Sequence, residues 1–377
     1  MSNDFLFADF QQVTAEQWQA QIEKDLKGKS FDDLRWHLGD DFVVAPFYTS
    51  ADNPVKKQAF STSADWEISE TIEVENEDYK AANRLALDAL MGGANALEFI
   101  ISYNTSATEM DVLLKGIELS YISTHFFYTG KKINQAQKKI EHFYTIAQKR
   151  GENTDTLRGS LHVAPLGHAP NWDKVAETCA WFSTHLPAFK CITINGRSFH
   201  TEPEYVGEEL GKTLCLANDF FNHLTDRNYT PSQVNQMLQL SISVDKSYFI
   251  NIAKIRALKL LYLNLMKAYH IENESVAPIE AHFAPLSFDK NVNTNMIRAT
   301  TMALSAVSGG VARLNVLPSE PTNTPFSRRI ARNVQHLLKM ESYLDKVADP
   351  SAGSYYIEQL TEMIASKAWD YFIYTLD

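Results

Sequence analysis

Residues 299–317 read ATTMALSAVSGGVARLNVL, in which a helical pattern stops at a glycine pair and a short strand pattern follows at once. An earlier copy shares five positions at the same spacing: Leu87, Ala89, Gly92, Gly93 and Leu97 match Leu304, Ala306, Gly309, Gly310 and Leu314. Paired glycines suit the left-handed conformation that ends a helix. Each copy therefore predicts a helix, a stop and a strand. A phosphate-binding role is not expected, because a phosphate loop follows a strand and opens a helix.

The same alternation of strand and helix patterns extends from Phe60 to Pro318 and is typical of βα units on a parallel sheet. Eight strands are predicted: Trp66–Val74, Ala96–Tyr103, Leu119–Phe127, Ser160–Pro165, Cys191–Asn195, Leu238–Val244, Pro278–Ala284 and Ala312–Leu317. Their span is close to the ~250 residues of an eight-stranded barrel, with the eighth helix expected at Pro325–Tyr343. We therefore predict an α/β protein built on a (β/α)8 TIM barrel.

Two segments lie outside the barrel pattern. Phe10–Lys27 reads as an amphipathic helix with Thr14 as its N-cap, and Tyr355–Leu376 reads as a second helix after a turn at 349–353. We expect an N-terminal arm over residues 1–60, a barrel domain over 61–345 and a C-terminal turn and helix over 346–377.

Large apolar side chains are concentrated in the predicted arm. Six of them are candidates for subunit contact: Trp18, Ile22, Leu34, Trp36, Phe42 and Tyr48. So much apolar surface is unfavourable in a free tail. We expect either the outside of the barrel or another chain to cover it.

The composition excludes several classes of partner. A formal net charge of −11 argues against nucleic acid, and the one basic stretch, Arg328, Arg329 and Arg332, is expected to be a solvated helix face. No run approaches the roughly 18 apolar residues of a membrane helix. Acidic Asp4 and Asp9 stand where a signal peptide carries basic residues, so we expect a cytoplasmic protein with no membrane partner.

Catalytic residues of a barrel lie at the C-terminal ends of its strands. Four histidines fall near such ends, with Glu280 close to the last: His125, His162, His200 and His282. Several strand-end histidines can converge on one ion, as in a metal-dependent hydrolase. The chain has no His-x-His pair and no His-Glu-x-x-His helix, so no metal site is expected. The cysteines Cys179, Cys191 and Cys215 are too scattered for a zinc site and are predicted to be buried thiols.

Other catalytic motifs are missing from the sequence, which has neither a Gly-x-Ser-x-Gly elbow nor a Gly-x-Gly-x-x-Gly fingerprint. Small polar residues stand near several strand ends instead: Ser102, Thr193, Asn195, Ser241 and Ser243. Facing inward, they would line a polar substrate channel in place of the usual Val, Ile and Leu layers. Facing outward, they would meet the surrounding helices. The pattern leaves both readings open.

The C-terminal third carries a resemblance to a known family. SRRIARN at 327–333, ESYL at 341–344 and KVADPSAGSYYIE at 346–358 together resemble the end of the substrate barrel in methylmalonyl-CoA mutases. IAKIRA at 252–257 resembles the helix after the sixth strand of that family, and the 299–317 unit also fits. Leu34-Arg35-Trp36, followed by APFY at 45–48, is similar to the arm of the family's small subunits.

This resemblance implies a radical interconversion of methylmalonyl-CoA and succinyl-CoA, with adenosylcobalamin supplying the reactivity. The cobalt-ligating Asp-x-His-x-x-Gly motif of the family is missing, so this chain alone is expected to bind no adenosylcobalamin. The fifth strand of catalytic subunits ends in Gly-Tyr-His, where this chain has Gly196-Arg197-Ser198. A serine cannot replace an imidazole as proton donor. His200 is a candidate for residual activity, and Gln239 stands where catalytic subunits use an arginine near CoA.

The resemblance therefore implies a small, catalytically silent subunit that stabilises a catalytic large subunit, with adenosylcobalamin in the assembled enzyme. An isolated chain could pair with itself as a homodimer. The alternative is an independent barrel enzyme that acts on another acyl-CoA with a separately encoded cobalamin domain. A metal-dependent hydrolase is a third reading. The sequence leaves open whether a cobalamin-like domain follows Asp377.

Overall fold

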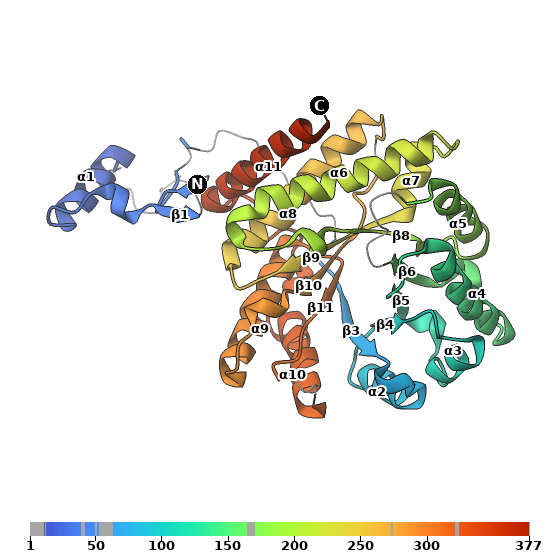
Figure 1. Ribbon diagram of the computed structural model, residues 1–377. Coiled ribbons are helices and arrows are strands. Elements are labelled where there is room, and N and C mark those ends of the chain that lie inside the picture. The colour runs from blue at the N-terminus through green and yellow to red at the C-terminus, as the bar shows by residue number, and fades with distance from the viewer. Residues whose placement is uncertain are drawn as a thin grey trace, which may run out of the picture.

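A computed structural model describes residues 11, 13–38, 42–49, 51–52, 63–163, 170–272, 274–320 and 324–376. Parallel strands form a barrel ringed by helices, and the predicted α/β barrel is confirmed (Figure 1). The strands are β3 (Glu67–Glu73), β4 (Ala96–Ile101), β5 (Ser123–Tyr128), β6 (Arg158–Val163), β7 (Phe189–Lys190), β8 (Ile192–Asn195), β9 (Leu238–Val244), β10 (Ile279–Phe283) and β11 (Arg313–Asn315). Their order is β7-β6-β5-β4-β3-β11-β10-β9-β8.

The fifth predicted strand, Cys191–Asn195, corresponds to β8, and β7, which the sequence does not predict, lies just before it. β7 pairs with β6, and β8 pairs with β9. β6 and β8 have no backbone ladder between them in the described residues, but the Thr193 hydroxyl donates to the carbonyl of Leu161 at 2.9 Å. The Thr193 side chain thus connects β6 and β8 where the backbone hydrogen bonding of the barrel is interrupted.

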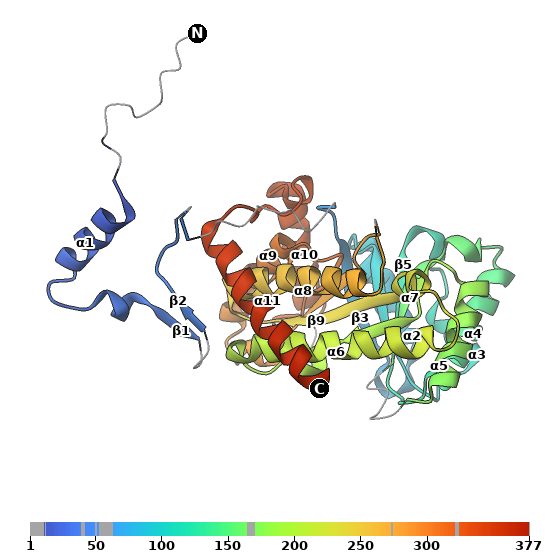
Figure 2. The same ribbon diagram turned by 90° about the horizontal axis from the view of Figure 1, so that it is seen from above.

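Helices alternate with the strands and cover the outside of the barrel (Figure 2). They are α2 (Tyr79–Met91), α3 (Ala107–Leu113), α4 (Ile133–Lys149), α5 (Trp172–His185), α6 (Val206–Thr225), α7 (Pro231–Met237), α8 (Tyr248–Ala268), α9 (Val292–Gly309) and α10 (Pro325–His336). Gly93 and Gly310 have φ of 88° and 83° at the ends of α2 and α9, as the repeat predicts. None of the described helices is long and apolar enough to cross a membrane.

The basic stretch on α10 differs from the expected solvated face. Arg329 is exposed, but Arg328 and Arg332 are buried and both pair with Glu70 of β3. Arg332 also reaches Asp88 at 3.2 Å. The expectation was wrong for these two arginines because a half-buried carboxylate on the first barrel strand, Glu70, holds them against the barrel.

The C-terminal helix α11 spans Tyr355–Leu376, as predicted, and packs on α6 and α8 (Figure 2). Arg256 of α8 has no exposed surface and pairs with Asp349 and Glu358. The buried arginine thus ties the 349–353 turn and the start of α11 to the barrel.

The N-terminal arm contains α1 (Ala15–Asp25), shorter than predicted, with Thr14 capping it as expected. It also contains an antiparallel pair, β1 (Trp36–Leu38) and β2 (Phe42–Val44), which the sequence analysis did not predict. α1 stands apart from the barrel in both views (Figures 1 and 2). No residue of α1 is buried.

Candidate functional site

Along the barrel strands, most apolar residues face the helices and most polar residues face the barrel axis. On β9, Leu240 and Ile242 belong to the apolar core, whereas Gln239 reaches side chains of β8 and β10. The mutually contacting inward side chains form what we call the polar interior: Glu67, Thr71, Glu98, His125, Ser160, Thr193, Gln239, Glu280, His282, Arg313 and Asn315. Period-two alternation on parallel strands places such residues together inside a barrel.

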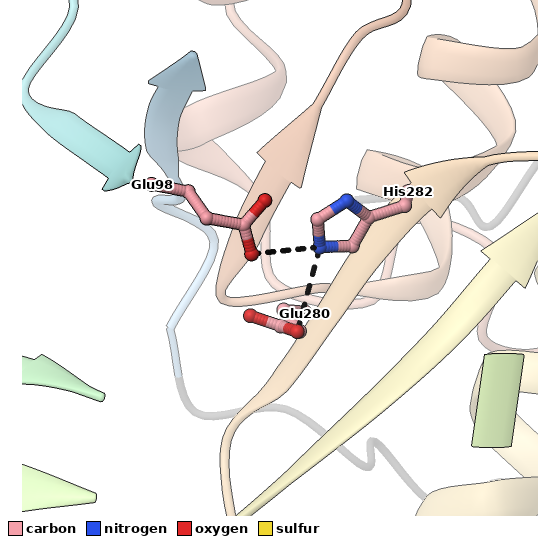
Figure 3. Close-up of side chains that lie close together, drawn as sticks. All are labelled: Glu98, Glu280 and His282. Atoms are coloured by element: carbon pink, nitrogen blue, oxygen red, sulfur yellow. Dashed lines mark ion pairs between the residues drawn. The ribbon is translucent and has the colours of Figure 1, made fainter. Parts of the chain in front are cut away.

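The centre of the polar interior is a group of two carboxylates and one imidazole (Figure 3). His282 Nε2 lies 3.7 Å from Glu98 Oε1 and 3.4 Å from Glu280 Oε1. Glu280 and His282 are two residues apart on β10, so they share its inner face, and Glu98 reaches them from β4. One ligand atom of each residue lies within 4.8 Å of the others, the spacing of a metal-ion site.

Neighbouring side chains hold this group in place. Arg313 forms an ion pair with Glu280, and Gln239 Nε2 donates to Glu280 Oε2 at 3.3 Å. Thr71 donates to Glu98 Oε2 at 3.0 Å. The two carboxylates are therefore held by side chains from three further strands, β11, β9 and β3.

Burial dominates the electrostatics of this group. It lowers the pKa of His282 to about 3, with the positive charge of Arg197 adding to the effect. Burial works to raise the pKa of Glu98, but His282 and then the guanidiniums of Arg313 and Arg197 outweigh it and lower that pKa. At neutral pH Glu98 is therefore a carboxylate and His282 a neutral imidazole.

Two further histidines lie inside the barrel. His125 contacts Ser160 Oγ at 2.7 Å and Glu67 Oε2 at 3.3 Å, and burial lowers its pKa to about 4. Burial opposes the charge on Glu67, but its contacts with His125 and Ser123 lower its pKa to about 2. His162 is buried without a hydrogen-bond partner on either ring nitrogen among the described residues.

The residues at the end of the fifth strand point in different directions. Arg197 lies over the ring of Phe127 at 5.5 Å, and its charge reaches Glu98 inside the barrel. Ser198 is exposed, and its hydroxyl donates to the carbonyl of Asn195. This serine does not contact the polar interior.

His200 is held outside the polar interior. Its Nδ1 lies 2.9 Å from Glu209 of α6, and its Nε2 lies 3.8 Å from Asp245 after β9. Glu209 in turn pairs with Lys254 at 3.0 Å.

The structure separates the channel candidates. Thr193 and Gln239 contact each other at 2.8 Å inside the barrel, and Ser241 is fully buried with no hydrogen-bond partner among the described residues. Asn195 is half-buried at the end of β8, and its Oδ1 has no such partner. Ser102 instead accepts from the backbone of Asn104 in a turn after β4.

Sequence reasoning singled out five members of the polar interior and missed six: Glu67, Thr71, Glu98, Ser160, Arg313 and Asn315. Two of these are the one charged residue of a largely apolar segment, Glu98 in ALEFII at 96–101 and Arg313 in VARLNVL at 311–317. A lone charge at an inward position of a buried strand was the available signal.

A cavity of about 370 Å³ opens at the C-terminal end of β3, β10 and β11. His282 and Asn315 belong to its lining, as do Arg328, Arg332 and Gln335 of α10. Of the carboxylate and imidazole group, the lining includes His282.

Comparison with known proteins identifies the family. The model of the family described as Methylmalonyl-CoA mutase matches residues 103–375. The chain belongs to the methylmalonyl-CoA mutase family. It is 31% identical to a methylmalonyl-CoA mutase small subunit of Porphyromonas gingivalis, over 98% of this chain and 63% of that protein. A small subunit of Streptomyces virginiae is 26% identical, over 97% of this chain and 64% of the relative.

A methylmalonyl-CoA mutase of Cereibacter sphaeroides is 24% identical, over 93% of this chain and 57% of the relative. The chain thus spans about six-tenths of the length of these mutase relatives. Among solved structures, a dihydropteroate synthase of Xanthomonas albilineans has a TM-score of 0.39 at 12% identity, covering 74% of this chain and 92% of that one.

Proposed function

We propose that this chain is the non-catalytic small subunit of an adenosylcobalamin-dependent methylmalonyl-CoA mutase and that it stabilises a catalytic large subunit. The relatives named as small subunits, which align over nearly the whole chain, support this role. The large subunit, the acyl-CoA substrates and adenosylcobalamin belong to the assembled enzyme in this proposal. We expect that assembly in the cytoplasm, with no adenosylcobalamin bound by this chain alone.

The proposal that this chain is not catalytic rests on its filled barrel interior. Glu98, Glu280 and Arg313 are each at most 3% exposed and cross-linked by hydrogen bonds and ion pairs. A substrate on the barrel axis would have to displace them, and each displaced charge would lose its partner, at about 3–5 kcal/mol for a broken buried pair.

The end of the fifth strand supports the same conclusion. Ser198 has no acidic proton to offer a thioester carbonyl and points to its own backbone. His200, the candidate for residual activity, is engaged by Glu209 instead. No described side chain supplies the imidazole that the family's Gly-Tyr-His motif would place at this strand end.

The arm offers a surface for the partner. Trp18 is 53% exposed, Trp36 is 43% exposed and Leu34 is 39% exposed, while Ile22 is half-buried. The other two candidates are covered by this chain itself: Phe42 is buried, and Tyr48 packs on Tyr356 at 6.0 Å.

The arm is thus anchored through β2 and presents α1 and β1 outward. Burying large apolar side chains is worth roughly 1.5–3 kcal/mol each, so the exposed surface favours a second chain. We expect that chain to be the large subunit, or a second copy when this chain is isolated.

Co-expression with the large subunit from the same source, followed by gel filtration, tests the contact. The double variant Trp18→Ser with Trp36→Ser should co-elute much less than the wild type. Its own melting temperature should fall only slightly, because both rings are exposed and the contact of Trp18 with Phe47 lies within the arm. Tyr121→Ser is the matched control, since Tyr121 is 79% exposed on the barrel. Equal co-elution of all three proteins would show that the arm is not the contact.

The alternative, an independent barrel enzyme, makes a different prediction. It requires an acyl-CoA to enter the polar interior, and the cavity above His282 is the available entrance. Saturable binding of an acyl-CoA by the isolated chain would favour the alternative.

A further inference from the structure

We propose that Glu98, Glu280 and His282 bind one divalent metal ion, which links β4 to β10 inside the barrel. In the sheet, β3 and β11 lie between these two strands. The ion would therefore connect two strands that are not direct neighbours, from inside the barrel. The site would be structural, and it does not depend on the proposed partner or on mutase activity.

Three possible ligand atoms converge at this point of the barrel, one each from Glu98, Glu280 and His282, all within 4.8 Å of one another. Glu280 Oε1 is buried and has no hydrogen-bond partner among the described residues, yet it lies 3.4 Å from His282 Nε2. Asn315 Nδ2 lies 3.3 Å from the same nitrogen, so an ion at Nε2 would require this amide to turn away. A buried carboxylate oxygen without a partner, next to two further ligand atoms, favours a cation between them.

The donor set indicates the class of ion. Two carboxylate oxygens and one imidazole nitrogen suit Mn²⁺, Fe²⁺ or Zn²⁺ better than a soft thiophilic ion. Arg313 and Gln239 occupy Glu280 Oε2, so Glu280 would ligate through Oε1 alone. The cavity that reaches His282 provides an entry path and room for water as a further ligand.

The sequence predicts no metal site, because the chain has no His-x-His pair and no His-Glu-x-x-His helix. His125, His162 and His200 are not part of the group that the structure brings together. Glu98 supplies the missing third ligand, and it comes from a strand distant in sequence.

The test is direct metal binding by the intact chain. Protein stripped with EDTA and then desalted is titrated with Co²⁺, followed by its visible d–d absorption, and with Mn²⁺ and Zn²⁺ by calorimetry. We expect about one equivalent per chain and a rise in melting temperature with metal. Glu98→Gln and His282→Asn should weaken binding at least about tenfold, whereas His125→Asn, in the same barrel but outside the group, should bind normally.

Absence of saturable binding by the wild type, or equal binding by Glu98→Gln, overturns the proposal. If the ligand variants do not fold, a wild-type crystal grown with Mn²⁺ decides through its anomalous signal. A peak between Glu98 and His282 supports the site, and a peak elsewhere or none refutes it. Metal binding without partner binding would refute the proposed subunit role and leave this inference intact.

Discussion

At the scale of a single residue, Arg256 connects the C-terminal turn and the start of α11 to the barrel helix α8. It is fully buried and neutralises the carboxylates of Asp349 and Glu358. Arg256→Met would leave both carboxylates without this cation, so we expect a loss of about 3–5 kcal/mol in the free energy of unfolding. Urea denaturation measures it. Lys174→Met, which breaks an exposed pair with Glu177, should cost at most about 1 kcal/mol, and equal losses would contradict the argument.

His125 gives the fold an acid sensitivity. Its pKa falls from 6.5 to about 4 on folding, because burial disfavours the charged ring. Below pH 6.5 the unfolded chain binds a proton that the folded chain does not, so stability falls until pH reaches about 4. His125→Asn should flatten the stability curve over that window by up to about 3 kcal/mol. Denaturation in EDTA across this range checks it, and an unchanged slope would be inconsistent with a neutral buried ring.

At the scale of the element, tight packing between strands is concentrated at Gly159 of β6. A Cβ there would lie 1.8 Å from the carbonyl oxygen of Thr124 on β5 and 2.6 Å from the ring of Phe189. Gly159→Ala should therefore separate the two strands and cost at least about 2 kcal/mol. The neighbouring Ser160→Ala removes one hydrogen bond to His125 and should cost about 1 kcal/mol. Thermal melts of the two variants compare them, and a Gly159→Ala protein as stable as Ser160→Ala would contradict this packing.

Strand periodicity explains how much of the fold the sequence predicts. The barrel, α11 and the Thr14 cap follow from local patterns, and each is present. β7 and the β1–β2 pair cannot be recognised from the local sequence, because both depend on which strand lies alongside. Short strands of two or three residues carry too few alternations to be recognised.

The polar interior was only partly predictable for the same reason. Glu280 and His282 are close in sequence, so their common face follows from alternation on one strand. Glu98 comes close to them only because β3, the first barrel strand, pairs with β11, the last. This pairing brings β4 and β10 into the same part of the sheet. Similarly, the sequence around Arg328 and Arg332 has the pattern of a surface helix. Their burial depends on Glu70, which pairs with both and is distant in sequence.

At the scale of the whole molecule, a barrel of the mutase family encloses its own charged side chains, and an arm with exposed tryptophans extends from it (Figure 2). Ionic cross-links occupy the barrel axis, and the exposed surface of the arm offers a contact for the large subunit that we propose as its partner. Both features support the proposed role of a subunit that assists catalysis elsewhere in an assembly.

Mutase turnover is the measurement that tests this account most directly. Conversion of methylmalonyl-CoA to succinyl-CoA is followed with adenosylcobalamin for this chain alone, for the large subunit alone and for the two co-expressed. We expect no turnover by this chain alone and sustained turnover by the pair, with the large subunit losing activity faster by itself. Turnover by this chain alone, or supplied only with a separate cobalamin domain, would contradict the account.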